Sequence, residues 1–165
     1  IMEKAGVPLV PGYHGADQSL ETLVEECKKI GFPVLVKAAL GGGGKGMKVA
    51  TCEEECVDAI QSAQREALSS FSDQRVLLEK YVGSPRHIEV QVLADSHGKV
   101  LHFYERDCSV QRRHQKIIEE GPPIAAPPAV FKKMEQAAIA LAKAVGYCNA
   151  GTVEFLFLFV CSTWN

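Results

Sequence analysis

The chain has 165 residues, enough for one domain, or for one domain and part of a second. It is 47% hydrophobic and 23% charged, a composition typical of a folded protein and not of a disordered one. The net charge of −2 gives no general attraction to polyanions, so we expect no nucleic-acid partner.

No apolar run reaches the length of about 18 residues that crosses a membrane, so no membrane span or anchor is expected.

Six cysteines occur, and none has CxxC spacing. We expect reduced thiols and not a disulfide framework or a zinc site.

The first half of the chain predicts helices that alternate with short strands. A helix is expected over 20–30, between Ser19 as N-cap and Gly31 as stop. Strands over 34–38 and 47–50 flank a glycine-rich segment. Thr51 and Glu54 form a predicted capping box for a helix that continues to about residue 71. Its expected buried face contains Val57, Ile60, Ala63, Ala67 and Leu68.

The second half predicts three strands, over 76–82, 87–94 and 99–106, and later a helix over 129–145 and a strand over 151–159. The polar segment 107–120 has a periodicity that suits neither a helix nor a regular strand. Because helices and hairpins mix without strict βαβ alternation, the pattern predicts an α+β fold and not a doubly wound sheet.

Gly41–Gly46, with the sequence GGGGKG, is the strongest local motif. It fits GxGxxG, but a strand and not a helix is expected behind it, and the GK[ST] of a Walker A loop is absent. A glycine-rich hairpin between strands can close over phosphates, as in protein kinases, but no DFG motif follows. A functionless flexible turn remains the alternative, although a two-residue turn would serve that purpose.

Isolated charges in apolar strands are the next candidates. Lys37 could hold a phosphate or reach solvent from an edge. Glu154 could ligate a metal ion or lie at a solvent edge. His87, Glu89 and Gln91 share one face of a strand, which could equally be a solvated face.

Segment 106–120 mixes basic residues with Gln and His. A solvated charge run is the usual interpretation of such a stretch. The composition also suits an anion site with acid–base capacity, in which His114 stabilises a phosphate oxygen and a lysine of lowered pKa moves a proton.

Several motifs together resemble the ATP-grasp domain of biotin carboxylases, over about positions 1–156. They are FPVLVKA (32–38), GGGGKGM (41–47), EKY (79–81), PRHIEVQV (85–92), ERDCSVQRRHQKIIEE (105–120) and AGTVEF (150–155). PGYHG (11–15), QREA (64–67) and YCNAGT (147–152) look most like the alpha subunits of methylcrotonoyl-CoA carboxylases. Propionyl-CoA, acetyl-CoA and pyruvate carboxylases share the core motifs.

The resemblance implies a role for each matching position. ATP would contact Lys37, Gly43, Gly44, Glu79, Lys80, Tyr81, Val82, His87, Gln111 and His114. Of these, 79–82 would hold the adenosine end, largely through backbone groups. Lys116, at bicarbonate, and His114, near the terminal phosphate, would be the catalytic residues. Glu154 would ligate the metal ion.

The implied reaction is the carboxylation of biotin with ATP, bicarbonate and Mg²⁺ or Mn²⁺, with carboxyphosphate as intermediate. Biotin would be carried on another domain, and the implied partners are a biotin carboxyl carrier domain and a carboxyltransferase subunit. The implied location is the mitochondrial matrix. The implied organisation is the end of an N-terminal domain (1–12), a lid subdomain (13–82) and part of the second ATP-grasp subdomain (83–165).

The chain departs from the family after the Glu154 strand, where FLFVCSTWN (157–165) stands in place of FxEMNTRxQVEH, and both ends are expected to be cut from something larger. With one metal carboxylate where the family has two, we expect the 165 residues to be inactive alone. A non-catalytic ATP-binding or interaction module remains an alternative. A carbamoyl-phosphate synthetase is disfavoured by the RRHQK string.

Overall fold

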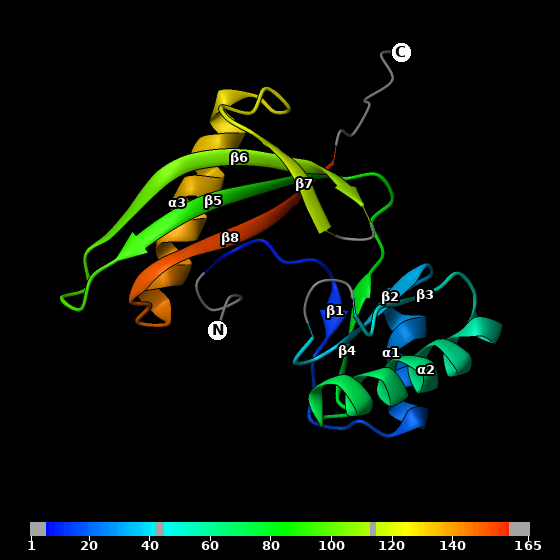
Figure 1. Ribbon diagram of the computed structural model, residues 1–165. Helices are drawn as coiled ribbons and strands as arrows, with labels where there is room; N and C mark the ends of the chain where they lie inside the picture. Colours follow the sequence, from blue (N-terminus) through cyan, green and yellow to red (C-terminus); the bar gives the residue numbers. More distant parts are fainter. Residues whose placement is uncertain (1–5, 42–44, 113–114, 159–165) are drawn as a thin grey trace, which may run out of the picture. The chain divides into compact units, whose positions relative to one another are not determined.

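The computed structural model describes residues 6–41, 45–112 and 115–158 (Figure 1). The described chain contains three helices and two four-stranded sheets, and it divides into two compact units. One unit covers the described parts of 10–81 together with Gln115, and the other covers the described parts of 1–9, 82–112 and 116–165. The expected mixture of helices and antiparallel strands is confirmed.

In the 10–81 unit, the sheet has the strand order β1-β4-β2-β3. The strands are β1 (Gly12–Tyr13), β2 (Val34–Ala38), β3 (Lys48–Ala50) and β4 (Val76–Lys80), and the helices are α1 (Leu20–Ile30) and α2 (Glu53–Phe71). Both helices join one core with the sheet, including Leu23, Ile60 and Leu78, all fully buried. Burial of these apolar surfaces supplies the main stabilisation of the unit.

The start of α1 agrees with the prediction, and the start of α2 does not. Ser19 caps α1, since its hydroxyl accepts a hydrogen bond from the Thr22 N–H, and Gly31 ends the helix at φ 80°. The predicted capping box at α2 is wrong. Cys52 is the N-cap, and Glu55 takes up the N–H and the hydroxyl of Thr51, 2.8 and 2.7 Å away.

The buried face of α2 is also rotated relative to the prediction. Ile60, Ala63 and Ala67 are buried as expected, but Val57 is 37% and Leu68 is 53% exposed. Cys56 and Ala59 take their places in the core. Because hydrophobic residues occur on both sides of the stripe, only packing against the sheet decides which of them are covered.

In the other unit, the sheet has the order β7-β6-β5-β8. Its strands are β5 (Arg86–Ala94), β6 (Val100–Arg112), β7 (Gln115–Glu120) and β8 (Asn149–Phe157), and α3 (Pro128–Ala144) crosses one face of the sheet (Figure 1). Ile88, Val90 and Val92 of β5 pack against Met134 and Ala138 of α3. The opposite face of β5 carries the polar residues 87, 89 and 91.

The prediction that 107–120 lacks regular structure is wrong. Residues up to Arg112 extend β6, and Gln115–Glu120 form β7. Backbone pairing within the sheet holds these residues extended, although their charges show no clean alternation.

A bulge in β6 sets which of its side chains face α3. Val92 pairs with His102 and Val90 with Glu105, so Gln91 alone lies opposite the two residues Phe103 and Tyr104. Tyr104 has φ 62°, in the left-handed region. The extra residue shifts the alternation by one, so that Glu105 faces α3 and the next residue, Arg106, faces away from it.

No described helix is both long and apolar enough to pass through a membrane. The five described cysteines are free thiols, as predicted, and Cys161 lies outside the described residues.

Candidate functional site

Two carboxylates lie directly opposite each other on the polar face of the β5–β8 pair. Glu89 of β5 is the register partner of Glu154 of β8. Like charges at directly opposite positions destabilise a sheet unless a cation lies between them. Lys116 of β7 is that cation: its Nζ donates to Glu89 Oε2 and, at 2.7 Å, to Glu154 Oε1.

Glu89 is the centre of this cluster and is almost fully buried, with its side chain 2% exposed. Oε1 accepts a hydrogen bond from Nη2 of Arg106, the register partner of Glu89 on β6. Burial raises the pKa of Glu89, but Lys116 and then Arg106 outweigh it and lower that pKa overall. A buried carboxylate therefore stays ionised because both of its oxygens are paired with cations.

Lys116 likewise stays protonated. Burial opposes that charge, but hydrogen bonds to Glu154 and Glu89 outweigh it and raise the pKa of Lys116. The prediction of a lysine with a lowered pKa in this segment is therefore wrong for Lys116. Its ammonium suits the holding of an anion and not the acceptance of a proton.

Glu154 lies at a solvent edge, one of the two interpretations of its place in the sequence, and its role as a metal ligand stays a prediction. It lies on β8, an edge strand, with its side chain 52% exposed, and it is also paired with Lys116. The imidazole of His87 and then the ammonium of Lys116 lower the pKa of Glu154 to about 2, against an opposing effect of burial. The carboxylate is thus ionised at any physiological pH.

His87 joins the same cluster from β5. Its Nδ1 lies 2.9 Å from Nε2 of Gln111, whose amide also donates to the Cys108 carbonyl at 2.8 Å. Its Nε2 is buried, lies 3.5 Å from Glu154 Oε1, and has no hydrogen-bond partner among the described residues. A buried ring nitrogen without a hydrogen bond is the kind of group that a ligand or an ion satisfies.

Ligand atoms of His87, Glu89 and Glu154 all lie within 4.8 Å of one another. Carboxylate oxygens with one imidazole suit Mg²⁺ or Mn²⁺ better than a soft metal, which prefers thiolates. The residues present therefore fit a hard divalent cation.

In the 10–81 unit, the predicted residues form a second cluster. Lys37 Nζ lies 2.7 Å from Glu79 Oε2, and both side chains are about one-third exposed (31% and 30%). Lys80 Nζ donates to the carbonyls of Gly31 and Phe32, at 2.8 and 2.7 Å. That side chain therefore ties the end of α1 to β4.

The backbone of this segment is also partly occupied. The N–H of Lys80 donates to Pro11 and that of Tyr81 to Pro33, at 2.7 and 3.0 Å. Any backbone contribution of these two residues to a ligand must then come from their carbonyls. Val82 is half-buried, in the other unit.

The structure thus brings together His87, Gln111, Lys116 and Glu154 in one unit, and Lys37 and Glu79 in the other. Gly43, Gly44 and His114 lie outside the described residues. Glu89 and Arg106 were not singled out as site residues from the sequence. The shared face of 87, 89 and 91 pointed to Glu89, but nothing in the sequence placed Arg106 opposite it.

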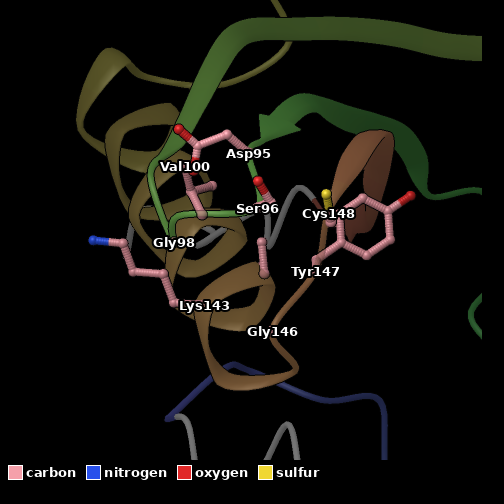
Figure 2. Close-up of a pocket in the computed structure, with 9 residues that line it drawn as sticks. Asp95, Ser96, Gly98, Val100, Lys143, Gly146, Tyr147 and Cys148 are labelled. Atoms are coloured by element: carbon pink, nitrogen blue, oxygen red, sulfur yellow. The ribbon is translucent and has the colours of Figure 1, made fainter.

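A separate cavity of about 670 Å³ lies where the β5–β6 turn meets the end of α3 (Figure 2). Its lining includes Asp95, Lys143, Tyr147 and Cys148 and contains none of the predicted site residues.

Comparison with known proteins gives three kinds of match. Residues 1–160 match the family model described as "Carbamoyl-phosphate synthase L chain, ATP binding domain". The mitochondrial methylcrotonoyl-CoA carboxylase subunit alpha of Dictyostelium discoideum is 60% identical over 156 residues, 94% of this chain and 22% of that protein. The chloroplastic biotin carboxylase 2 of Populus trichocarpa is 53% identical over 155 residues, 94% of this chain and 30% of that protein.

Solved structures agree with the fold. A Campylobacter jejuni biotin carboxylase, described as a β-γ-ATP complex, superposes with a TM-score of 0.90 at 50% identity, over 94% of this chain and 35% of that one. The biotin carboxylase domain of the Hydrogenobacter thermophilus 2-oxoglutarate carboxylase, in complex with MgADP, ADP and bicarbonate, gives 0.89 at 44%, over 94% and 34%. The expected ATP-grasp fold is confirmed.

The chain spans about a fifth to a third of the length of these relatives (22% and 30% of the two proteins, 35% and 34% of the two structures). The family match itself extends over nearly all of this chain. The chain therefore belongs to the family of ATP-binding domains named after the carbamoyl-phosphate synthase L chain, and it resembles the biotin carboxylases within it.

Proposed function

We propose that this chain is the ATP-binding part of a biotin carboxylase of the methylcrotonoyl-CoA carboxylase type. The reaction is the carboxylation of biotin with ATP, bicarbonate and Mg²⁺ or Mn²⁺, through carboxyphosphate. One observation carries the proposal: in a chain of this family, two facing carboxylates share a lysine, and the buried Nε2 of His87 lies 3.5 Å from one of them with no hydrogen-bond partner among the described residues.

In this proposal, Glu154 would hold the divalent cation, and the buried Nε2 of His87, 3.5 Å from Glu154 Oε1, would face the same cation. The cation would supply positive charge for the phosphate oxygens of ATP. Lys116, which stays protonated, holds bicarbonate and the carboxyphosphate formed from it. His114, which belongs to the catalytic residues predicted from the sequence, would contact the terminal phosphate.

The 10–81 unit would act on the rest of the nucleotide. Lys37 is already ion-paired, so ATP phosphate would replace Glu79 as its partner. Gly43 and Gly44 would close over the phosphates and exclude water, which protects an intermediate that hydrolyses readily. The carbonyls of Glu79–Tyr81, with Val82, would hold the adenine end.

The two compact units would correspond to the lid (13–82) and to part of the second ATP-grasp subdomain (83–165). We further propose a biotin carboxyl carrier domain and a carboxyltransferase subunit as partners, and the mitochondrial matrix as the location. The mitochondrial relatives support the last point.

A segment exchange tests the proposal. The 156 residues of this chain that match the Dictyostelium methylcrotonoyl-CoA carboxylase subunit alpha would replace the corresponding segment of that protein. ATP hydrolysis that depends on bicarbonate and biotin would then be measured. We expect the chimera to be active, and a Lys116→Ala chimera to lose activity by a factor of about 100 or more. A folded chimera that binds MgATP without biotin-dependent turnover would instead support a non-catalytic ATP-binding module.

A further inference from the structure

Arg106 is the one described cation that contacts Glu89 besides Lys116. Its Nη2 donates to Glu89 Oε1 and, at 3.2 Å, to the side-chain oxygen of Gln91. Its Nη1 lies 3.4 Å from Glu119 Oε2. Arg106 is therefore anchored to three neighbours while its guanidinium holds one particular oxygen of Glu89.

The two oxygens of Glu89 are divided between two cations. Arg106 holds Oε1, and Lys116 holds Oε2. If Arg106 were absent, both oxygens would be free to turn toward Lys116 or toward a cation. Glu89 is close enough to bind such a cation, because its carboxylate lies within 4.8 Å of the ligand atoms of His87 and Glu154.

The charges in the cluster favour the same division. Glu89 and Glu154 face each other with only Lys116 shared between them. A second positive charge on Glu89 leaves more of the Lys116 charge available to an incoming anion. It also makes Glu89 a poorer ligand for a divalent cation than Glu154, which has no arginine partner among the described residues.

We propose that Arg106 is a positioning residue that fixes Glu89 as the anchor of Lys116 and keeps Glu89 out of the coordination of the divalent cation. This role rests on the proposed function, because the cation and the anion are those of the carboxylase reaction. The bulge at Phe103 and Tyr104 is what brings Arg106 to the position opposite Glu89.

The first readout is independent of any ligand. In the full 165-residue chain, ¹H–¹⁵N spectra would follow the side-chain ammonium of Lys116, assigned with Lys116→Arg. We expect Arg106→Gln to shift or broaden this signal, because Glu89 is no longer held in one orientation, and Arg106→Lys to restore it in part.

The matched control is Arg86→Gln. Arg86 pairs with the buried Asp107 on the face that packs against α3, so its loss also removes an arginine from a buried carboxylate of the same sheet. We expect the Lys116 signal to stay in place in Arg86→Gln. An unmoved signal in Arg106→Gln, or an equal change in both variants, would overturn the positioning role.

The second readout is the binding of Mn²⁺, measured by the loss of the free-ion signal in electron paramagnetic resonance. Removing a positive charge and freeing Glu89 should tighten Mn²⁺ binding by about three- to tenfold in Arg106→Gln. A purely structural arginine would leave binding unchanged or weaken it, as expected for Arg86→Gln, and that result would overturn the exclusion of Glu89.

Mn²⁺ binding by wild type and by Arg106→Gln separates a failure of the proposed function from a failure of the role of Arg106. If wild type and every variant bind no Mn²⁺, the proposed function and the exclusion of Glu89 both fall. If wild type binds Mn²⁺ through Glu154 but Arg106→Gln binds it no more tightly, the function stands and only the role of Arg106 in excluding Glu89 is lost.

Discussion

Lys37 on β2 and Glu79 on β4 form an ion pair of 2.7 Å between two strands of one sheet. Glu79 is the register partner of Leu35, so it lies diagonally across from Lys37 on the same face. A lysine in an apolar strand thus has a partner that a phosphate can replace.

Replacing Lys37 should weaken nucleotide binding. Lys37→Met removes a charge-assisted contact with phosphate, so we expect MgATP affinity to fall about 10- to 100-fold by titration calorimetry. Lys48→Met is the control, because Lys48 forms a comparable ion pair with Glu66 in the same unit. Equal affinities for wild type and Lys37→Met would remove Lys37 from the proposed site.

Glu154 should carry most of the affinity for the divalent cation. Glu154→Gln keeps the size of the side chain but removes its charge, and we expect Mn²⁺ affinity to fall about tenfold or more. Glu120→Gln removes an exposed carboxylate from β7 and should leave binding unchanged. Similar losses in both variants would indicate general electrostatic attraction and not a site.

Glu105 should make stability depend on pH. It is buried beneath α3, and burial and then the charge of Glu135 raise its pKa above 4.5. The folded state therefore binds this proton more tightly than the unfolded chain. The stabilisation that this proton gives the folded state is complete below the pKa of Glu105 in the unfolded chain. It is lost as the pH rises through the higher pKa of Glu105 in the folded chain.

Glu105→Gln should consequently stabilise the chain at pH 8 by about 1–3 kcal/mol, the usual cost of a poorly paired buried polar group. The gain should shrink toward pH 4, where Glu105 is protonated. Urea unfolding at several pH values measures it, with the exposed Glu25→Gln of α1 as control. A gain that stays constant with pH would contradict this titration.

The rotated face of α2 predicts a contrast between two leucines. Leu78 of β4 is fully buried, so Leu78→Ala should lower the free energy of unfolding by about 2–5 kcal/mol. Leu68 is 53% exposed, so Leu68→Ala should change it by no more than about 0.5 kcal/mol. A large loss in Leu68→Ala would support the face predicted from the sequence over the one in the structure.

Some features followed directly from local patterns of residues. Ser19 and Gly31 bounded α1 correctly, because caps depend on the residue at one position. The ATP-grasp family followed from several motifs together, of which the string 105–120 contains Lys116 and the motif 150–155 contains Glu154. The sequence therefore determined the fold class, most of the elements and the identities of the candidate ligands.

Other features depended on contacts between strands that are distant in the sequence. The pairing of β5 with β8 placed Glu89 opposite Glu154, and β7 supplied the lysine that both carboxylates share. This sharing raises the pKa of Lys116, whereas composition had suggested a lowered one. Local patterns do not contain such charge interactions, because they arise only when the sheet forms.

The bulge in β6 shows the difference most clearly. One extra residue there turns Glu105 toward α3 and Arg106 toward Glu89. The sequence by itself determined that the charges of Glu105 and Arg106 occur in this strand. Only the tertiary structure decided which face each side chain occupies, because side-chain direction reverses at every residue and a single shift in register exchanges the two faces.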